Sequence, residues 1–173
     1  MLKIFYAPHC GKNGSAAVYS LLDYAFRKEC GGIMPEIKKT PNGKPYFPDR
    51  LEIHFSLSHS KTHVLCAVST QPVGADIESP RTISGHAIRF YSTPMELSFF
   101  DPLDLWVLKE SYIKLIGGTL AMVKTIHFSC ECGKIITPDT SSLSKLYRIG
   151  NCRAAVCTYG DYLPDAIELV SGL

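Results

Sequence analysis

The chain has 173 residues, of which 46% are hydrophobic and 20% are charged, as in an ordinary soluble globular protein. This length suits one domain, or two small halves that share a core. The formal net charge of +2 is too small to indicate a nucleic-acid or membrane partner. Residues 1–14 do not resemble a signal peptide and no apolar run is long enough to span a bilayer, so we expect a soluble, cytoplasmic protein.

The seven cysteines are odd in number and irregularly spaced, which does not predict a disulfide framework. One residue separates Cys130 from Cys132, and no second cysteine pair of a zinc motif accompanies them. This spacing is not typical of a zinc site. We therefore expect reduced thiols, with Cys66 and Cys157 acting as small core residues.

The first half of the chain predicts a strand, a long helix and a further set of strands. Ser15 is the expected N-cap of the helix, and Gly31 and Gly32 end it. The sequence Pro-Asn-Gly at 41–43 predicts a turn. The expected bounds are 15–28 for the helix and 2–7, 33–39, 53–57 and 64–69 for the strands.

A Gln-Pro pair at 71–72 interrupts the chain, and the second half again begins with a strand and contains one long helix. Asp104 is the expected N-cap of this helix, and Gly117 and Gly118 end it. The two halves therefore predict two similar α+β lobes. The expected strands are 73–78, 125–130, 134–136, 146–149, 153–159 and 167–170, and the expected helices are 86–90, 94–100 and 104–116.

Two carboxylates share one face of the strand predicted at 73–78. Asp76 and Glu78 are two residues apart, and alternate strand residues point to the same side. Such a pair repels unless a cation or a base neutralises it, and oxygen ligands of this kind suit Mg²⁺. A solvated strand face is the alternative interpretation. Gly74, just before the pair, lets the backbone turn or lets a ligand approach closely.

The long helix of the second half carries a second group of polar residues. Trp106, Glu110 and Lys114 are spaced four apart, so they lie along one helix face, away from the apolar stripe. Glu110 is a candidate metal ligand or general base, and Lys114 is a candidate phosphate contact. A stabilising surface ion pair between Glu110 and Lys114 is the alternative.

Two further segments carry groups that can bind an anion. The sequence Ser58-His59-Ser60 at a strand end presents hydroxyls, an imidazole and loop N–H groups, although a turn histidine satisfied by local hydrogen bonds has the same pattern. A serine nucleophile is not indicated, because no G-x-S-x-G elbow is present. The turn at 41–43 presents Lys44 without a complete phosphate-loop motif, so Lys44 is either a ligand contact or a solvated charge.

These segments occur in one order: G-K-P at 43–45, F-S-L-S-H-S at 55–60, V-G-A-D-I-E at 73–78 and W-V-L-K-E-S-Y-I-K at 106–114. In that order they resemble the 4′-phosphopantetheinyl transferases, specifically the monomeric type that activates the surfactin synthetase (the Sfp type). The resemblance implies an α+β fold made of a pseudo-two-fold pair of similar lobes, each a small, mostly antiparallel sheet packed on a long helix. Residues 1–72 would form the N-terminal lobe and 73–173 the lobe that carries the metal site, as one pseudo-dimeric unit.

The resemblance also implies a holo-[acyl-carrier-protein] synthase type of activity. The enzyme would transfer the 4′-phosphopantetheine group from coenzyme A, bound between the lobes, to a serine of an apo acyl or peptidyl carrier protein, and release 3′,5′-adenosine bisphosphate. Asp76, Glu78 and Glu110 would hold Mg²⁺, with Glu110 also taking the serine proton. The implied coenzyme A contacts are Lys44, Ser58 and His59, with Lys114 at the pyrophosphate, and His9 and Lys12 are further candidates for holding the nucleotide.

Two other functions use the same residues. A Mg²⁺-dependent nucleotide phosphohydrolase also needs clustered carboxylates, and an inactive homologue that binds only coenzyme A or the carrier keeps the same motifs. Transfer of the arm to a carrier, rather than release of phosphate, distinguishes these functions. Phe90, Tyr91, Phe99 and Phe100 are candidates for an apolar docking patch or for the core.

Overall fold

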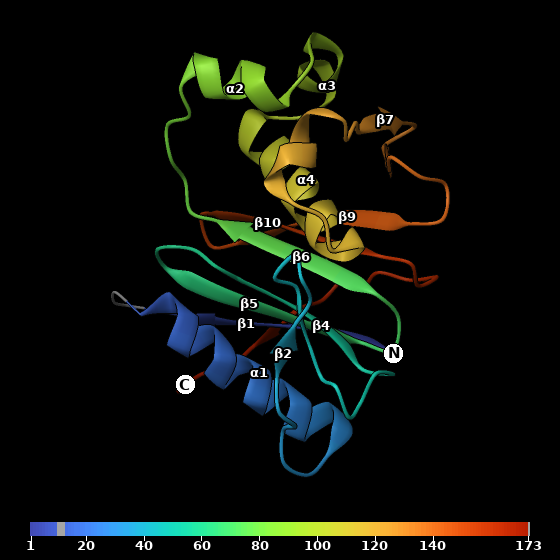
Figure 1. Ribbon diagram of the computed structural model, residues 1–173. Helices are drawn as coiled ribbons and strands as arrows, with labels where there is room; N and C mark the ends of the chain where they lie inside the picture. Colours follow the sequence, from blue (N-terminus) through green and yellow to red (C-terminus); the bar gives the residue numbers. More distant parts are fainter. Residues whose placement is uncertain (10–12, 173) are drawn as a thin grey trace.

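Two larger sheets, each covered by one long helix, form the framework of the chain (Figure 1). The computed structural model describes residues 1–9 and 13–172, so Cys10 and Lys12 lie outside the described residues. The predicted α+β class is confirmed, because helices and mainly antiparallel sheets pack together. The pseudo-two-fold relation between the halves stays a prediction. Among the described helices, none combines the length and apolar character needed to cross a bilayer.

The first sheet has the strand order β11-β1-β5-β4. Strands β1, β5 and β4 pair antiparallel, whereas β11, near the C-terminus, runs parallel to β1. Helix α1 (Gly14–Cys30) covers this sheet with its apolar side, and Leu21, Leu22 and Phe26 are buried. The strands are β1 (Leu2–Pro8), β4 (His54–His59), β5 (His63–Ser69) and β11 (Glu168–Leu169).

The predicted N-cap of α1 is wrong by two residues. The helix begins at Gly14, and the side chain of Asn13 accepts a hydrogen bond from the backbone N–H of Ala16. Asparagine and serine are about equally good N-cap residues, so residue type alone does not distinguish Asn13 from Ser15 as the cap. The predicted end is confirmed, because Gly31 takes the positive φ of 73° that favours glycine.

The second sheet has the strand order β6-β10-β9 and is antiparallel. Helix α4 (Pro102–Ile116) packs on it, and Leu105, Leu108 and Leu115 are buried along its apolar stripe. Its predicted N-cap is wrong: Asp101 precedes the first turn, and Asp104 lies inside the helix. The strands are β6 (Val73–Glu78), β9 (Leu143–Ile149) and β10 (Cys152–Thr158).

Shorter elements complete the fold. Strands β2 (Lys38–Lys39) and β3 (Pro45–Tyr46) form a hairpin, so most of the strand predicted at 33–39 is absent from the described chain. The strand predicted at 125–130 is also largely wrong, because residues 125–128 are irregular and a strand begins only at Ser129. The segment between α4 and this region forms a 3₁₀ turn with Val123 buried. The remaining elements are α2 (Gly85–Tyr91), α3 (Pro94–Phe99), η1 (Leu120–Lys124), β7 (Ser129–Glu131) and β8 (Lys134–Ile136).

The edge strands β4 and β6 bring the two sheets together without a backbone ladder. The backbone N–H of Ala75 donates to Ser56 Oγ at 2.8 Å, and that of Ile77 donates to Ser58 Oγ at 3.2 Å. These two bonds satisfy N–H groups on the outer edge of β6, which would otherwise be unpaired. We call this junction the seam. The candidate site lies along it.

Gly74 allows α4 to lie close on β6. A Cβ at this position would stand 1.9 Å from the backbone oxygen of Ser111 and 2.3 Å from the backbone nitrogen of Leu115. The close approach expected at Gly74 is therefore to a helix backbone. This contact holds the helix face that carries Glu110 and Lys114 beside the carboxylates of β6.

Candidate active site

The polar residues predicted from two separate motifs line one hollow of about 310 Å³. Asp76 and Glu78 come from β6, and Glu110 and Lys114 come from the face of α4 that also carries Trp106. Ser58 and His59, at the end of β4, complete the lining with Leu57. The structure thus brings together every residue that the sequence proposes for the acidic site.

The two oxygens of Asp76 differ in their surroundings. Oδ1 accepts hydrogen bonds from Ser58 Oγ and from the Lys114 ammonium, both at 2.7 Å. Oδ2 is buried and has no hydrogen-bond partner among the described residues. Only 5% of Asp76 is exposed, so water does not easily compensate this oxygen. An unpartnered carboxylate oxygen in an acidic hollow is suited to a cation.

Glu110 is strongly perturbed by its surroundings. Burial and the negative charges of Asp76 and Glu78 raise the pKa of Glu110 to about 7, although the Lys114 ammonium opposes the shift. A carboxyl group with a pKa close to neutrality is matched to general base catalysis. The same repulsion among carboxylates would be relieved by a bound cation.

The donor set fits a hard divalent cation that shares its ligands with a substrate. Within the described residues, no three side chains of His, Cys, Asp or Glu converge closely enough to hold a metal ion alone. Mg²⁺ typically keeps several waters and takes one or two carboxylates together with substrate phosphates. Such a site needs no complete protein cage, and the unpartnered Oδ2 of Asp76 fits this chemistry.

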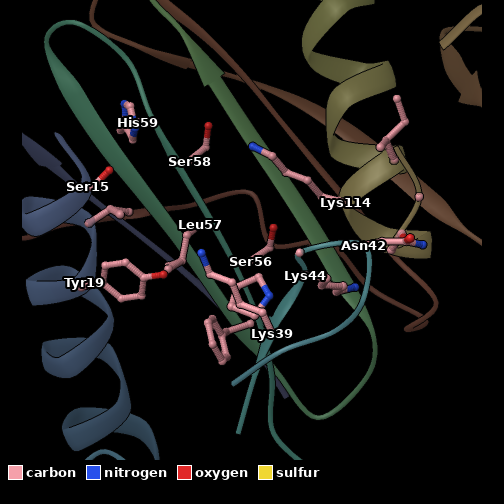
Figure 2. Close-up of a pocket in the computed structure, with 17 residues that line it drawn as sticks. Ser15, Tyr19, Lys39, Asn42, Lys44, Ser56, Leu57, Ser58, His59 and Lys114 are labelled. Carbon is pink, nitrogen blue, oxygen red and sulfur yellow. The ribbon is translucent and has the colours of Figure 1, made fainter. Parts of the chain in front are cut away.

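A second pocket, also of about 310 Å³, opens beside the acidic hollow and shares Leu57, Ser58, His59 and Lys114 with it (Figure 2). Its walls come from α1, from the β2–β3 hairpin, from β4 and from the end of α4, so both sheets contribute. No local sequence pattern identifies Tyr19 and Lys39 as lining residues. The pocket is lined by Ser15, Val18, Tyr19, Lys39, Asn42, Gly43, Lys44, Pro45, Phe55, Ser56, Leu57, Ser58, His59, Ile113, Lys114, Gly117 and Gly118.

Lys44 lines this pocket, but its ammonium is turned to the end of α4. Nζ donates to the backbone oxygen of Leu115 at 2.7 Å, and the neighbouring Asn42 side chain donates to the backbone oxygen of Gly117 at 3.0 Å. Burial lowers the pKa of Lys44 to about 8. Lys44 is therefore not a solvated charge, and its ammonium is not directed only at a ligand. Together with Asn42 it connects the hairpin to the helix.

His59 lies against the beginning of α1. A Cβ added to Gly14 would stand 2.9 Å from His59 Nδ1, so the glycine makes room for the imidazole. The first N–H groups of a helix and its dipole favour an anion. His59 and the start of α1 therefore lie together where an anionic group of a ligand in the shared pocket would be favoured.

The aromatic candidates divide between core and surface. Tyr91 and Phe100 are 3% and 8% exposed and belong to the core of the second sheet, whereas Phe90 and Phe99 are 50% and 45% exposed. Only the latter two are available for an apolar contact surface.

No family model matches the chain. It is 33% identical over 147 residues to the 4′-phosphopantetheinyl transferase Sfp of Bacillus subtilis (strain 168), covering 75% of this chain and 65% of that protein. It is 38% identical over 150 residues to the 4′-phosphopantetheinyl transferase ffp of Bacillus subtilis, with the same two coverages. The chain thus spans less than two thirds of the length of these relatives. From these similarities, and from the motifs that meet at the seam, the chain belongs to the superfamily of Sfp-type 4′-phosphopantetheinyl transferases.

Proposed function

We propose that the chain transfers the 4′-phosphopantetheine group of coenzyme A to a serine of an apo acyl or peptidyl carrier protein and releases 3′,5′-adenosine bisphosphate. One observation carries the proposal. Three carboxylates and Lys114 converge beside a pocket built from both sheets, in a chain whose relatives are named as transferases of this kind. A pyrophosphate fits such a place, because it needs positive charge on one side and an activated hydroxyl on the other.

Asp76, Glu78 and Glu110 would hold Mg²⁺, and the unpartnered Oδ2 of Asp76 supports this assignment. When bound, the ion would neutralise charge on the pyrophosphate. Lys114, which already stands 2.7 Å from Asp76, would supply a second positive charge to the same phosphates. His59 and Lys44 line the pocket where the remaining parts of coenzyme A would lie.

Glu110 would accept the proton of the carrier serine, directly or through a water, and its raised pKa suits this role. The serine oxygen then forms a bond to the β-phosphorus. The bond between that phosphorus and the bridging oxygen breaks, and the electron pair leaves with 3′,5′-adenosine bisphosphate. Catalysis rests mainly on positioning and on charge, as in other phosphoryl transfers.

We further propose that residues 1–72 and 73–173 work as one pseudo-dimeric unit, which acts as a monomer in the cytoplasm. The pocket between the sheets supports the first part of this proposal, because it needs α1 and β4 from one half and α4 from the other.

Mass spectrometry of an apo carrier protein tests the activity. With coenzyme A and Mg²⁺, the wild-type protein should raise the carrier's mass by one phosphopantetheine group, and Asp76→Ala should not, while its circular dichroism stays native. Folded wild-type protein that modifies none of several apo carriers but releases phosphate from nucleotides would support a phosphohydrolase instead. Binding of coenzyme A without either reaction would support the inactive homologue.

A further inference from the structure

The hydroxyl of Ser58 is committed to protein groups at the seam. It donates to Asp76 Oδ1 at 2.7 Å and accepts the backbone N–H of Ile77 at 3.2 Å, and Ser58 is only 7% exposed. A serine hydroxyl has one hydrogen to donate. Ser58 therefore has no second O–H to offer to a phosphate oxygen unless it gives up the bond to Asp76.

The bond from Ser58 also decides which oxygen of Asp76 remains available. Oδ1 is occupied by two donors, Ser58 and Lys114, whereas Oδ2 is buried without a partner among the described residues. Ile77 N–H fixes the serine oxygen, and the serine fixes the carboxylate. The carboxylate is thus held from the strand β4, which belongs to the other sheet.

We infer that Ser58 is a positioning residue, whose hydroxyl orients Asp76 so that Oδ2 keeps no protein partner and is left to a divalent cation, and that its O–H is not a donor to coenzyme A. The inference rests on the proposed function, because it assigns the cation to Asp76. It differs from the role that the family resemblance implies for Ser58. Groups that hydrogen-bond a metal ligand typically change metal affinity about 10- to 100-fold when removed.

Ser56 provides a matched control on the same strand. Its hydroxyl also accepts a backbone N–H of β6, that of Ala75 at 2.8 Å, and it is also buried, at 4% exposure. Its side chain makes no hydrogen bond to a carboxylate among the described residues. Ser56→Ala removes one hydrogen bond between β4 and β6, whereas Ser58→Ala removes two, and only Ser58→Ala releases Asp76.

Mn²⁺ binding to the purified protein, followed by electron paramagnetic resonance with and without coenzyme A, tests the inference. Ser58→Ala should weaken Mn²⁺ binding by about 10-fold or more, whereas Ser58→Thr, which keeps the hydroxyl, and Ser56→Ala should stay near wild type. In transfer assays, Ser58→Ala should need correspondingly more Mg²⁺ for half-maximal rate, with the KM for coenzyme A unchanged once Mg²⁺ is saturating. Thermal melts establish that each variant is folded.

Three results would overturn the inference: unchanged Mn²⁺ affinity in Ser58→Ala, an equal loss in Ser56→Ala, or a raised KM for coenzyme A with intact Mn²⁺ binding. If wild type binds Mn²⁺ no better than Asp76→Ala but still modifies carriers, the role of Ser58 is wrong and the proposed function stands. If the Mn²⁺ difference appears but no carrier is modified, the proposed function is wrong and the positioning role stands.

Discussion

Replacing Lys109 by methionine would remove a positive charge from the interior beneath α2 and α3. Lys109 is 0% exposed, and its Nζ stands 2.8 Å from Oε1 of Glu96, which is 2% exposed. Glu96 also caps α3, because it accepts hydrogen bonds from the backbone and side chain of Thr93, and it accepts the backbone N–H of Phe128. One ion pair thus connects α3, α4 and the segment before β7.

The expected cost follows from the carboxylate that is left behind. Although burial alone would raise the pKa of Glu96, the hydrogen bond and charge of Lys109, with the N–H groups of Thr93 and Phe128, hold it below its ordinary value. Breaking a buried pair by removing one partner typically costs about 3–5 kcal/mol. We expect a loss in this range for Lys109→Met at pH 8. The loss should be smaller at pH 5, because without the lysine the pKa of Glu96 rises and protonation relieves the unpaired charge.

Urea unfolding followed by circular dichroism measures this loss. Lys28→Met is a matched control, since Lys28 stands 2.7 Å from Glu168 in an exposed pair, and its loss should be much smaller. In Lys109→Met with Glu96→Gln, the neutral amide leaves no unpaired charge, so the double variant should lose less than the sum of the single variants. A loss below about 1 kcal/mol in Lys109→Met, or strict additivity in the double variant, would refute the reasoning.

Three other predictions concern the packing and the titrating groups. Gly74→Ala should lose at least about 3 kcal/mol or fail to fold, because its Cβ would stand 1.9 Å from the backbone oxygen of Ser111. Gly85→Ala, where the new Cβ meets only the end of a flexible side chain, should melt near wild type in the same thermal scans. For Glu110, the pKa of about 7 in the folded protein exceeds its ordinary value of 4.5, so metal-free wild type loses stability as pH rises between these values. Glu110→Gln removes this loss, and calorimetry should find a larger gain in melting temperature at pH 8 than at pH 5; equal gains would contradict the assignment. For Lys44, burial lowers the pKa to about 8 from 10.5, so wild type should gain stability from pH 8 to 10.5. Lys44→Met should not show that gain in urea unfolding. Parallel pH profiles of the two proteins would contradict the lowered pKa of Lys44.

Local patterns predict the elements that carry the site. The strand Val73–Glu78 is found with the predicted bounds, because a short apolar run lies between two breaks in the chain. The spacing of Trp106, Glu110 and Lys114 correctly predicts one shared helix face, since helical geometry alone fixes it. That the strand and the helix face the same hollow depends on Gly74, whose function in close packing is visible only once α4 is in place.

Long-range contacts explain what the sequence does not reveal. Lys109 carries a charge and is expected at the surface, yet its partner Glu96 is thirteen residues away on another helix and no local pattern links them. The strand predicted at 167–170 is found as β11 (Glu168–Leu169), but its pairing with β1 joins the two ends of the chain, and no local pattern gives that partner. The sequence also does not reveal that the hydroxyls of Ser56 and Ser58 accept backbone N–H groups of β6, because serines on an alternating strand are expected to face solvent.

The seam couples the stability of the fold to the chemistry of the site. The hydrogen bond that satisfies Ile77 N–H on β6 ends on Ser58, whose own hydrogen bond orients Asp76. On the other side of the pocket, Lys44 and Asn42 tie the hairpin to the last carbonyls of α4, the helix that carries the remaining polar residues. A change in the spacing of the two sheets would therefore move the carboxylates and the pocket wall together. A seam substitution that releases a carboxylate should therefore alter ligand binding without touching the ligand, which is expected of Ser58→Ala and not of its control Ser56→Ala.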